Sequence, residues 1–192
     1  MIKFTKLTTN HPGYLFVEEL MHASFPESER RDDILQRRNT DFNSKFSTYL
    51  ITEDNNSTEE VSKTETYIGF ITLWNLDGFT YAEHLATSPK VRNKGYGAKI
   101  IEALLNMVEG TIVLEVELPE DELSKRRIGF YKRCGFELCN KPYMQPPYRK
   151  DGESIPMHIM YTGKDNIDNE FNSIVKDIYL NVYEYNVEIS EK

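Results

Sequence analysis

The residues best suited to chemistry lie at 85–99, where Gly95 and Gly97 stand in a loop expected to open a helix. Glycine lets the main chain approach a ligand closely, and the free N–H groups of a first helical turn form an anion site. Residues 90–99 carry four cations and no acid, and residues 125–133 carry five cations and no acid. In a chain of net charge −8, this clustering favours a polyanionic ligand.

Two other phosphate-binding motifs fit this loop less well. A P-loop needs a Lys-Ser/Thr pair after its last glycine, and the sequence has none there. A dinucleotide fingerprint needs a third small residue three positions after Gly97, where Ile100 stands, although Glu115 lies about 20 residues on, as that fingerprint requires. A turn with solvated lysines is the alternative in which the loop binds nothing.

Two motifs together resemble the GNAT superfamily, the acyl-CoA-dependent N-acyltransferases. Arg92-x-x-Gly95-x-Gly97-Ala98 resembles the R/Q-x-x-G-x-G/A signature of that family. Residues 129–136, which read GFYKRCGF, resemble its later F-Y-x-x-x-G-F element. The expected order of elements over residues 2–162 also matches, so the resemblance covers most of the chain and leaves residues 163–192 beyond the common core.

The resemblance implies that the cosubstrate is acetyl-CoA. The main chain of Leu85, Ala86 and Thr87 would pair with the pantetheine arm, and an amide near Leu85 or Ala86 would polarise the thioester carbonyl. The glycine loop would hold the pyrophosphate, and the candidate residues there are Arg92, Asn93, Lys94, Gly95, Tyr96, Gly97 and Ala98.

The resemblance also implies two catalytic residues. Tyr131 occupies the family's position for the general acid, and a phenol with a pKa of about 10 can protonate a departing thiolate. Glu83 lies where several relatives carry a base, and we expect burial to raise its pKa into a useful range. The structural alternatives are a packing role for Tyr131 and a surface or ion-paired carboxylate at Glu83.

Other residues remain candidates for the site. Glu115 and Glu117 share one face of a predicted strand and could attract a cationic amine or replace Glu83 as the base, as could a chain of waters. His84 is expected to point away from Glu83, in a structural role, unless a bulge intervenes. The resemblance places the acceptor pocket near Phe25-Pro26-Glu27, Tyr143 and Tyr148.

The expected order of strands and helices indicates an α/β fold of the α+β type. We predict a single GNAT-like domain at residues 1–164, with a central mixed, mostly antiparallel sheet, splayed central parallel strands and helices on both faces. Residues 165–192 form a helical extension that docks on the domain. Strands are predicted at 2–7, 46–52, 66–74, 79–86, 111–118, 136–140 and 155–162, helices at 14–21, 28–38, 95–108, 124–134 and 167–187, and a solvated hairpin loop at 53–63.

Composition limits the partners. The 192 residues are 39% apolar, and 31 acidic against 23 basic residues argue against nucleic acid or an anionic membrane as a partner. Cys134 and Cys139 suggest neither a disulfide framework nor a metal site, and they lie away from the expected thioester position. Without a signal-peptide pattern or a long apolar run, the chain is expected in the cytoplasm.

The prediction for function is an N-acetyltransferase that moves an acetyl group from acetyl-CoA to a primary amine. Transfer is expected to be direct, in a ternary complex, without a metal or an acyl-enzyme. The acceptor stays open among polyamines, amino acids, aminoglycosides and protein amines, with a small molecule favoured over a protein and a monomer or homodimer expected. The alternative is a non-catalytic CoA-binding sensor or regulatory module.

Overall fold

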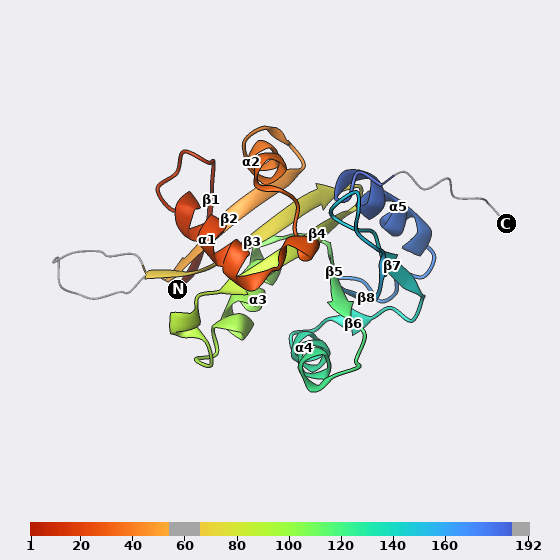
Figure 1. Cartoon of the computed structure of the whole chain (residues 1–192). Helices are drawn as coiled ribbons and strands as arrows, with labels where there is room; N and C mark the ends of the chain where they lie inside the picture. Colours follow the sequence, from red (N-terminus) through yellow and green to blue (C-terminus); the bar gives the residue numbers. More distant parts are fainter. Residues whose placement is uncertain (54–65, 186–192) are drawn as a thin grey trace. The chain divides into compact units, whose positions relative to one another are not determined.

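The computed structural model describes residues 1–53 and 66–185 (Figure 1). Most of the loop predicted at 53–63 and the last residues of the helix predicted at 167–187 lie outside the described residues. The helices are α1 (Tyr14–Ser24), α2 (Asp33–Phe42), α3 (Tyr96–Met107), α4 (Glu122–Arg133) and α5 (Phe171–Asn181). The strands are β1 (Ile2–Lys6), β2 (Phe46–Glu53), β3 (Thr66–Leu76), β4 (Phe79–Thr87), β5 (Thr111–Glu117), β6 (Glu137–Leu138), β7 (Tyr143–Gln145) and β8 (Ile155–Thr162).

The strands form a mixed sheet in the order β1-β2-β3-β4-β5-β8-β6, with β7 also paired to β8. β4 and β5 are parallel, and Phe79 to Tyr81 lie opposite Thr111 to Val113. α3 connects these two strands, which is the crossover that parallel neighbours require. β5 and β8 are antiparallel, as are β1 and β2. The predicted mixed sheet and its parallel crossover are therefore confirmed.

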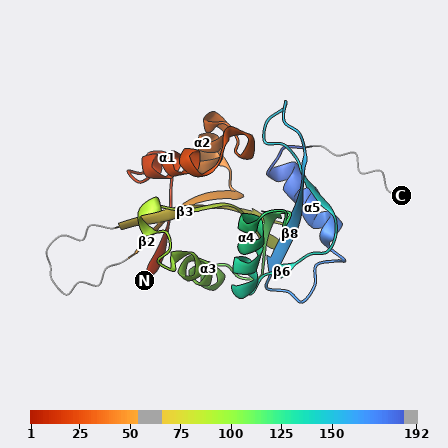
Figure 2. The same cartoon turned by 60° about the horizontal axis from the view of Figure 1, so that its bottom comes forward.

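Unit 1, the first of two compact units, comprises Met1–Glu27, Asp32–Leu73 and Ala82–Glu109. Within it, α1 and α2 lie on one face of the strands and α3 lies on the other (Figure 2). α1 buries one face because its apolar residues recur at helical spacing. The core between α1 and the strands consists of Leu7, Tyr14, Val17, Leu20, Met21, Leu50, Phe70 and Ala86.

Unit 2 comprises Ser28–Arg31, Trp74–Tyr81 and Gly110–Lys192, of which residues 186–192 are not described. β5 is central to it, since Ile112, Val113 and Val116 are fully buried. α4 contacts β5 and β6 and begins with a capping box in which Asp121 and Ser124 satisfy each other's backbone N–H groups. No helix among residues 1–53 and 66–185 is long and apolar enough to cross a membrane.

Several elements differ from the sequence prediction, and the helix predicted at 167–187 is confined to Phe171–Asn181. The helix predicted from residue 28 begins at Asp33, because the Asp32 side chain accepts the N–H of Leu35 and so caps the helix there. The proline-bearing loop contains β7, which was not predicted because its pairing with Ile155 to Met157 of β8 is a long-range contact. The strand predicted at 136–140 is confined to Glu137–Leu138.

Gly69 lets β3 approach β4 closely, so its replacement by alanine is expected to destabilise the protein. A Cβ atom at Gly69 would lie 2.2 Å from the Ala86 carbonyl oxygen and 3.0 Å from the Thr87 Cα, and both are backbone atoms. We expect Gly69→Ala to lower the free energy of unfolding by about 2 kcal/mol, as overpacking does. Urea denaturation measures this change.

Gly129→Ala is the matched control. Its Cβ would meet only the Arg133 Nη1 atom, at 3.4 Å, and alanine in a helix interior is favoured over glycine by about 1 kcal/mol. Gly129→Ala should therefore be neutral or stabilising. Equal unfolding midpoints for Gly69→Ala and the parent would show that the β3–β4 approach is not tight.

Candidate active site

The glycine loop has the backbone of an anion-binding turn. Asn93 (φ 62°) and Gly95 (φ 77°) both adopt the left-handed conformation, and Gly95 is the N-cap of α3. No side chain of residues 1–53 or 66–185 caps this helix, and its first turn contains no acidic residue. α2 is capped by Asp32 and α4 by Asp121, whereas α1 and α5, like α3, have no side-chain cap among the described residues. The Glu53 carboxylate of β2 accepts from the Tyr96 hydroxyl and lies 3.9 Å from the Lys99 Nζ. Among residues 1–53 and 66–185 no side chain caps the amides that open α3, so these amides can bind an anion.

Cations surround this loop. Lys90, Arg92, Lys94 and Lys99 are all exposed. The Lys94 Nζ donates to the Lys90 carbonyl at 3.1 Å, and the Arg92 Nε donates to the Thr87 carbonyl at 3.4 Å, so both side chains fold back onto the loop backbone. The loop thus combines uncapped amides with positive charge, which suits a phosphate ligand.

The end of β4 leads into this loop. Ser88 donates its backbone N–H to the Ile68 carbonyl at 2.7 Å, which holds this end of the strand against β3. Leu85 and Thr87 are half-buried and Ala86 is buried.

Glu83 has a fully buried side chain on β4. Its side chain is 0% exposed, which excludes the solvated carboxylate considered from the sequence. The Thr72 hydroxyl donates to Glu83 Oε2 at 3.3 Å, and the Nδ1 atom of His84 lies 3.5 Å from the same oxygen. A buried carboxylate can act as a general base.

His84 does not simply point away from Glu83, as regular strand alternation predicts. Burial along β4 changes phase: Phe79 and Tyr81 are buried in the first half, and His84 and Ala86 in the second. The backbone N–H of His84 donates to the Thr72 hydroxyl at 3.1 Å. Such an irregularity is typical of a bulge and brings the imidazole toward the carboxylate. The buried His84 ring also packs edge-on against Phe25, at 4.5 Å between centroids.

Tyr131 lies on α4, in unit 2. Its ring packs against Phe130 and Phe136, with centroids 5.2 and 5.5 Å away. Burial raises the pKa of Tyr131 to about 12. Within residues 1–53 and 66–185, no hydrogen bond engages its hydroxyl. The ring of Tyr131 is therefore held by packing, and its hydroxyl can donate a proton to a ligand.

Glu115, on β5, is the centre of a network of hydroxyl and amide donors. Tyr143, Gln145 and Tyr183 donate hydrogen bonds to its carboxylate, the last at 2.7 Å. Burial raises the pKa of Glu115, although these hydrogen bonds and one from Tyr81 act to lower it. The sequence singled out Glu115 and Tyr143, but it gave no signal for Gln145 or Tyr183, which reach Glu115 only through the fold.

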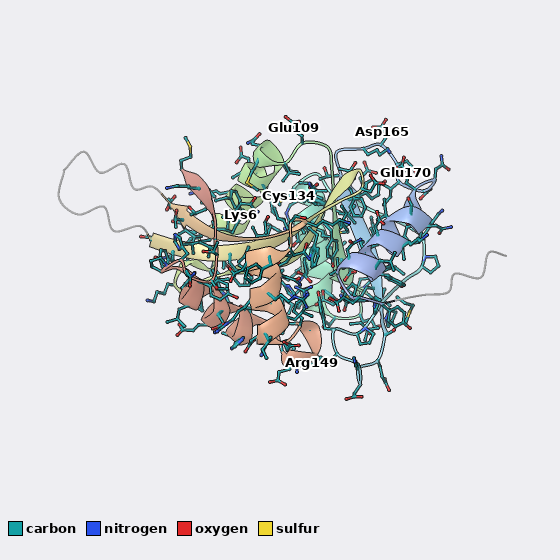
Figure 3. The ribbon with its side chains drawn as sticks, turned by 90° about the horizontal axis from the view of Figure 1, so that it is seen from above. Lys6, Glu109, Cys134, Arg149, Asp165 and Glu170 are labelled. Atoms are coloured by element: carbon teal, nitrogen blue, oxygen red, sulfur yellow. The ribbon has the colours of Figure 1, made fainter. Side chains whose placement is uncertain are left out.

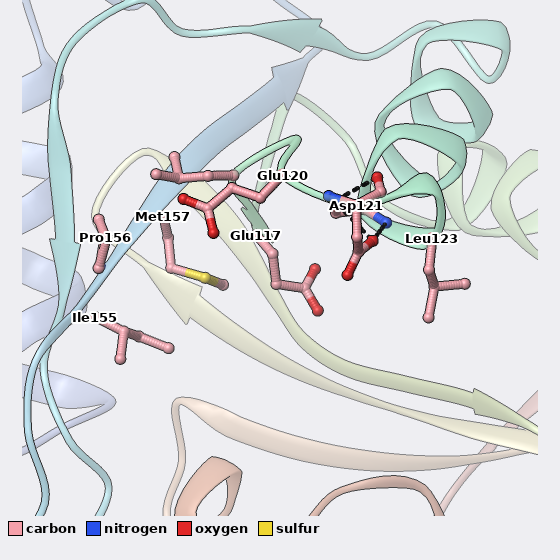
Figure 4. Close-up of a pocket in the computed structure, with 9 residues that line it drawn as sticks. Glu117, Glu120, Asp121, Leu123, Ile155, Pro156 and Met157 are labelled. Carbon is pink, nitrogen blue, oxygen red and sulfur yellow. Dashed lines mark hydrogen bonds between the residues drawn. The ribbon is translucent and has the colours of Figure 1, made fainter.

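Glu117 has a different environment from Glu115. Its carboxylate forms an ion pair with Arg127 of α4. It also lines a cavity of about 280 Å³, with Leu118, Glu120, Asp121, Leu123, Ser124, Ile155, Pro156 and Met157. Figure 4 shows Glu117 between the side chains of Met157 and Asp121. The hydrogen bond from the Ser124 backbone lowers the pKa of Asp121, which keeps this end of the cavity acidic.

Comparison with known proteins decides the family. The acetyltransferase (GNAT) domain family matches residues 45–138. A solved structure of a GNAT-family acetyltransferase from Bacteroides thetaiotaomicron is 38% identical, with a TM-score of 0.86 over 96% of this chain and 99% of that one. The chain belongs to the GNAT acetyltransferase family. A search of curated proteins finds no significant match.

More distant structures share the GNAT fold. An aminoglycoside 6′-N-acetyltransferase complexed with coenzyme A is 16% identical, with a TM-score of 0.58 over 84% of this chain and 96% of that one. A dodecameric spermidine N-acetyltransferase from Vibrio cholerae is 12% identical, with a TM-score of 0.58 over 88% of this chain and 97% of that one. The predicted fold class is confirmed, and this GNAT protein is an N-acetyltransferase.

The two cysteines of this GNAT protein are poor nucleophiles. Cys134, labelled in Figure 3, is the C-cap of α4. Cys134 is half-buried and Cys139 is buried. Burial raises the pKa of both thiols, so little reactive thiolate forms at neutral pH. Across the described ranges, no group of three His, Cys, Asp or Glu residues is arranged to hold a metal ion.

Proposed function

We propose that this GNAT protein transfers an acetyl group from acetyl-CoA to a primary amine by direct attack in a ternary complex. The observation that carries the proposal is the uncapped start of α3, with Asn93 and Gly95 in the left-handed conformation and four exposed cations around them. A pyrophosphate has acceptor oxygens for these backbone N–H groups and negative charge that attracts the cations. An amide at Leu85 or Ala86 would polarise the thioester carbonyl.

The reaction needs one base and one acid. The amine nitrogen forms a bond to the thioester carbon, its proton passes to Glu83 directly or through water, and the C–S bond breaks. Tyr131 gives its proton to the departing sulfur, so that CoA leaves as a thiol. The buried carboxylate of Glu83 and the free hydroxyl of Tyr131 support these roles. Burial, which raises the pKa of the Cys134 and Cys139 thiols, supports direct transfer over an acyl-enzyme.

A cationic small molecule is the acceptor that we favour. The chain carries a net charge of −8, and acidic side chains line the cavity beside β5. Structural neighbours include acetyltransferases of spermidine and of aminoglycosides, both of which are amines. We place the protein in the cytoplasm, as a monomer or homodimer.

Gly95→Val is expected to weaken CoA binding at least about tenfold, or roughly 1.4 kcal/mol. A valine at φ 77° is strained, and its side chain would project from the loop that meets the pyrophosphate. Isothermal calorimetry with CoA measures the change. Gly78→Val is the control, because Gly78 (φ 79°) is equally strained and has equally open surroundings in the β3–β4 turn. Equal losses of CoA affinity in both variants would show that the loop at Gly95 does not bind the pyrophosphate of CoA.

Thiol release tests the activity. Acetyl-CoA is incubated with a panel of polyamines, amino acids, aminoglycosides and peptides, and free CoA is detected with a thiol reagent. The proposal predicts thiol release that depends on at least one amine and is reduced in Gly95→Val. CoA binding with no amine-dependent release would instead identify a sensor or regulatory module.

A further inference from the structure

Glu115 is held entirely by neutral groups. Tyr143 donates to its Oε1 atom, and Gln145 and Tyr183 donate to its Oε2 atom. The Tyr81 hydroxyl lies 3.4 Å from that of Tyr183 and completes the shell. No lysine, arginine or histidine among residues 1–53 and 66–185 forms a hydrogen bond or an ion pair with Glu115.

Among the described residues, Glu117, unlike Glu115, has a cationic side chain as its counter-ion. Glu117 lies two residues further along β5 and has Arg127 as its counter-ion. The cation linked to the Glu115 network through aromatic contacts is Arg31, whose guanidinium stacks over Trp74 at 5.3 Å and over Tyr148 at 5.5 Å. It also donates to the Val182 carbonyl at 3.3 Å. Arg31 therefore packs against Trp74 and Tyr148 of unit 2 and does not pair with Glu115.

A carboxylate in this position is costly without a cation. Tyr143 and Tyr183 are buried, at 4% and 9% exposure, and burial has a larger effect on the pKa of Glu115 than its hydrogen bonds have. Neutral donors stabilise the ionised form but leave its charge unbalanced, whereas a bound cation offsets that charge. Glu115 as a residue is half-buried, so it keeps exposed surface.

We infer that Glu115, with the hydroxyls of Tyr143 and Tyr183, forms a subsite for an ammonium group of the acceptor, which makes the protein selective for cationic aliphatic amines. This inference deepens the proposed function and rests on it for the identity of the ligand as an acceptor. The donors come from β7 and from the segment after α5, and they fix the carboxylate oxygens in one orientation. An ammonium group contributes N–H donors together with the missing positive charge.

The test compares two probes of equal length, 1,4-diaminobutane and 1,4-butanediol, by calorimetry on the full chain saturated with CoA. The parent protein should bind the diamine at least about tenfold more tightly than the diol, because only the diamine carries ammonium groups. Glu115→Gln should lose this preference. Tyr183→Phe, which keeps the charge, should retain it. Glu137→Gln is the control, since Glu137 also accepts from a tyrosine, Tyr161, at 3.2 Å, but is exposed.

Three results would overturn the inference: no measurable binding of the diamine to the parent protein, equal affinity of the parent for diamine and diol, or an unchanged preference in folded Glu115→Gln. The comparison of diamine with diol in the parent and in Tyr183→Phe does not depend on the folding of Glu115→Gln. If the diamine binds through Glu115 but no amine releases CoA thiol, the proposed activity fails and the ammonium subsite stands.

Discussion

Tyr131→Phe is expected to lower the rate of acetyl transfer by about 10²-fold or more, the effect of removing a general acid. The ring packs against Phe130 and Phe136, and phenylalanine keeps both contacts, so fold and CoA affinity should not change. Because the pKa of Tyr131 is raised to about 12, the phenol stays protonated throughout the neutral range. The ratio of parent to variant rates should therefore be constant from about pH 7 to pH 10. Single-turnover kinetics under rapid quench measure it.

Tyr161→Phe is the control for this prediction. It also removes one tyrosine hydroxyl from unit 2, in this case one that donates to the exposed Glu137. Its single-turnover rate should match that of the parent. A Tyr131→Phe variant with the parental single-turnover rate would show that water protonates the thiolate and would remove Tyr131 from the mechanism.

Glu83→Gln is expected to lower kcat/KM at neutral pH by about 10²-fold or more, because it removes the general base. Glutamine keeps the shape of the side chain and can still accept from Thr72, but it cannot take a proton. In the parent, protonation of the base stops the reaction at low pH and gives the profile of kcat/KM an acid limb. When rates are expressed per free amine, this limb should vanish in the variant.

The pH profile separates Glu83 from the other candidate bases. Glu115→Gln and Glu117→Gln should both retain the acid limb, whatever they do to amine affinity. If Glu83→Gln keeps the parental profile and one of the other variants loses the limb, that other residue is the base. Retention of the limb in all three variants would point to a chain of waters.

The sequence predicts the elements of this fold well wherever they have a local cause. The left-handed turn at Gly95 and the apolar stripe of α3 are both encoded within a few residues. The sequence predicts too early a start for α2, because charged residues at 28–31 resemble a helix start, whereas the Asp32 side chain supplies the actual cap. β7 has no such local signal, since it exists through its pairing with β8.

The candidate site is predictable only in part, because some of its contacts are long-range and have no local signal in the sequence. Motif spacing is enough to single out the glycine loop and Tyr131. The proximity of His84 to Glu83 depends on an irregularity in β4 that involves Thr72, a residue on another strand. Tyr183 belongs to an apolar stripe at helical spacing in the sequence, and only the tertiary structure brings its hydroxyl to Glu115.

Transfer of a labelled acetyl group tests the central claim most directly. The full chain is incubated with acetyl-CoA carrying a 13C-labelled acetyl group and with the amine that gives the fastest thiol release, and both amine and protein are analysed by mass spectrometry. The proposal predicts one labelled N-acetyl group on the amine for each CoA thiol formed, and no label on the protein. Label on Cys134 or Cys139, or thiol release without an acetylated amine, would contradict direct transfer to an amine.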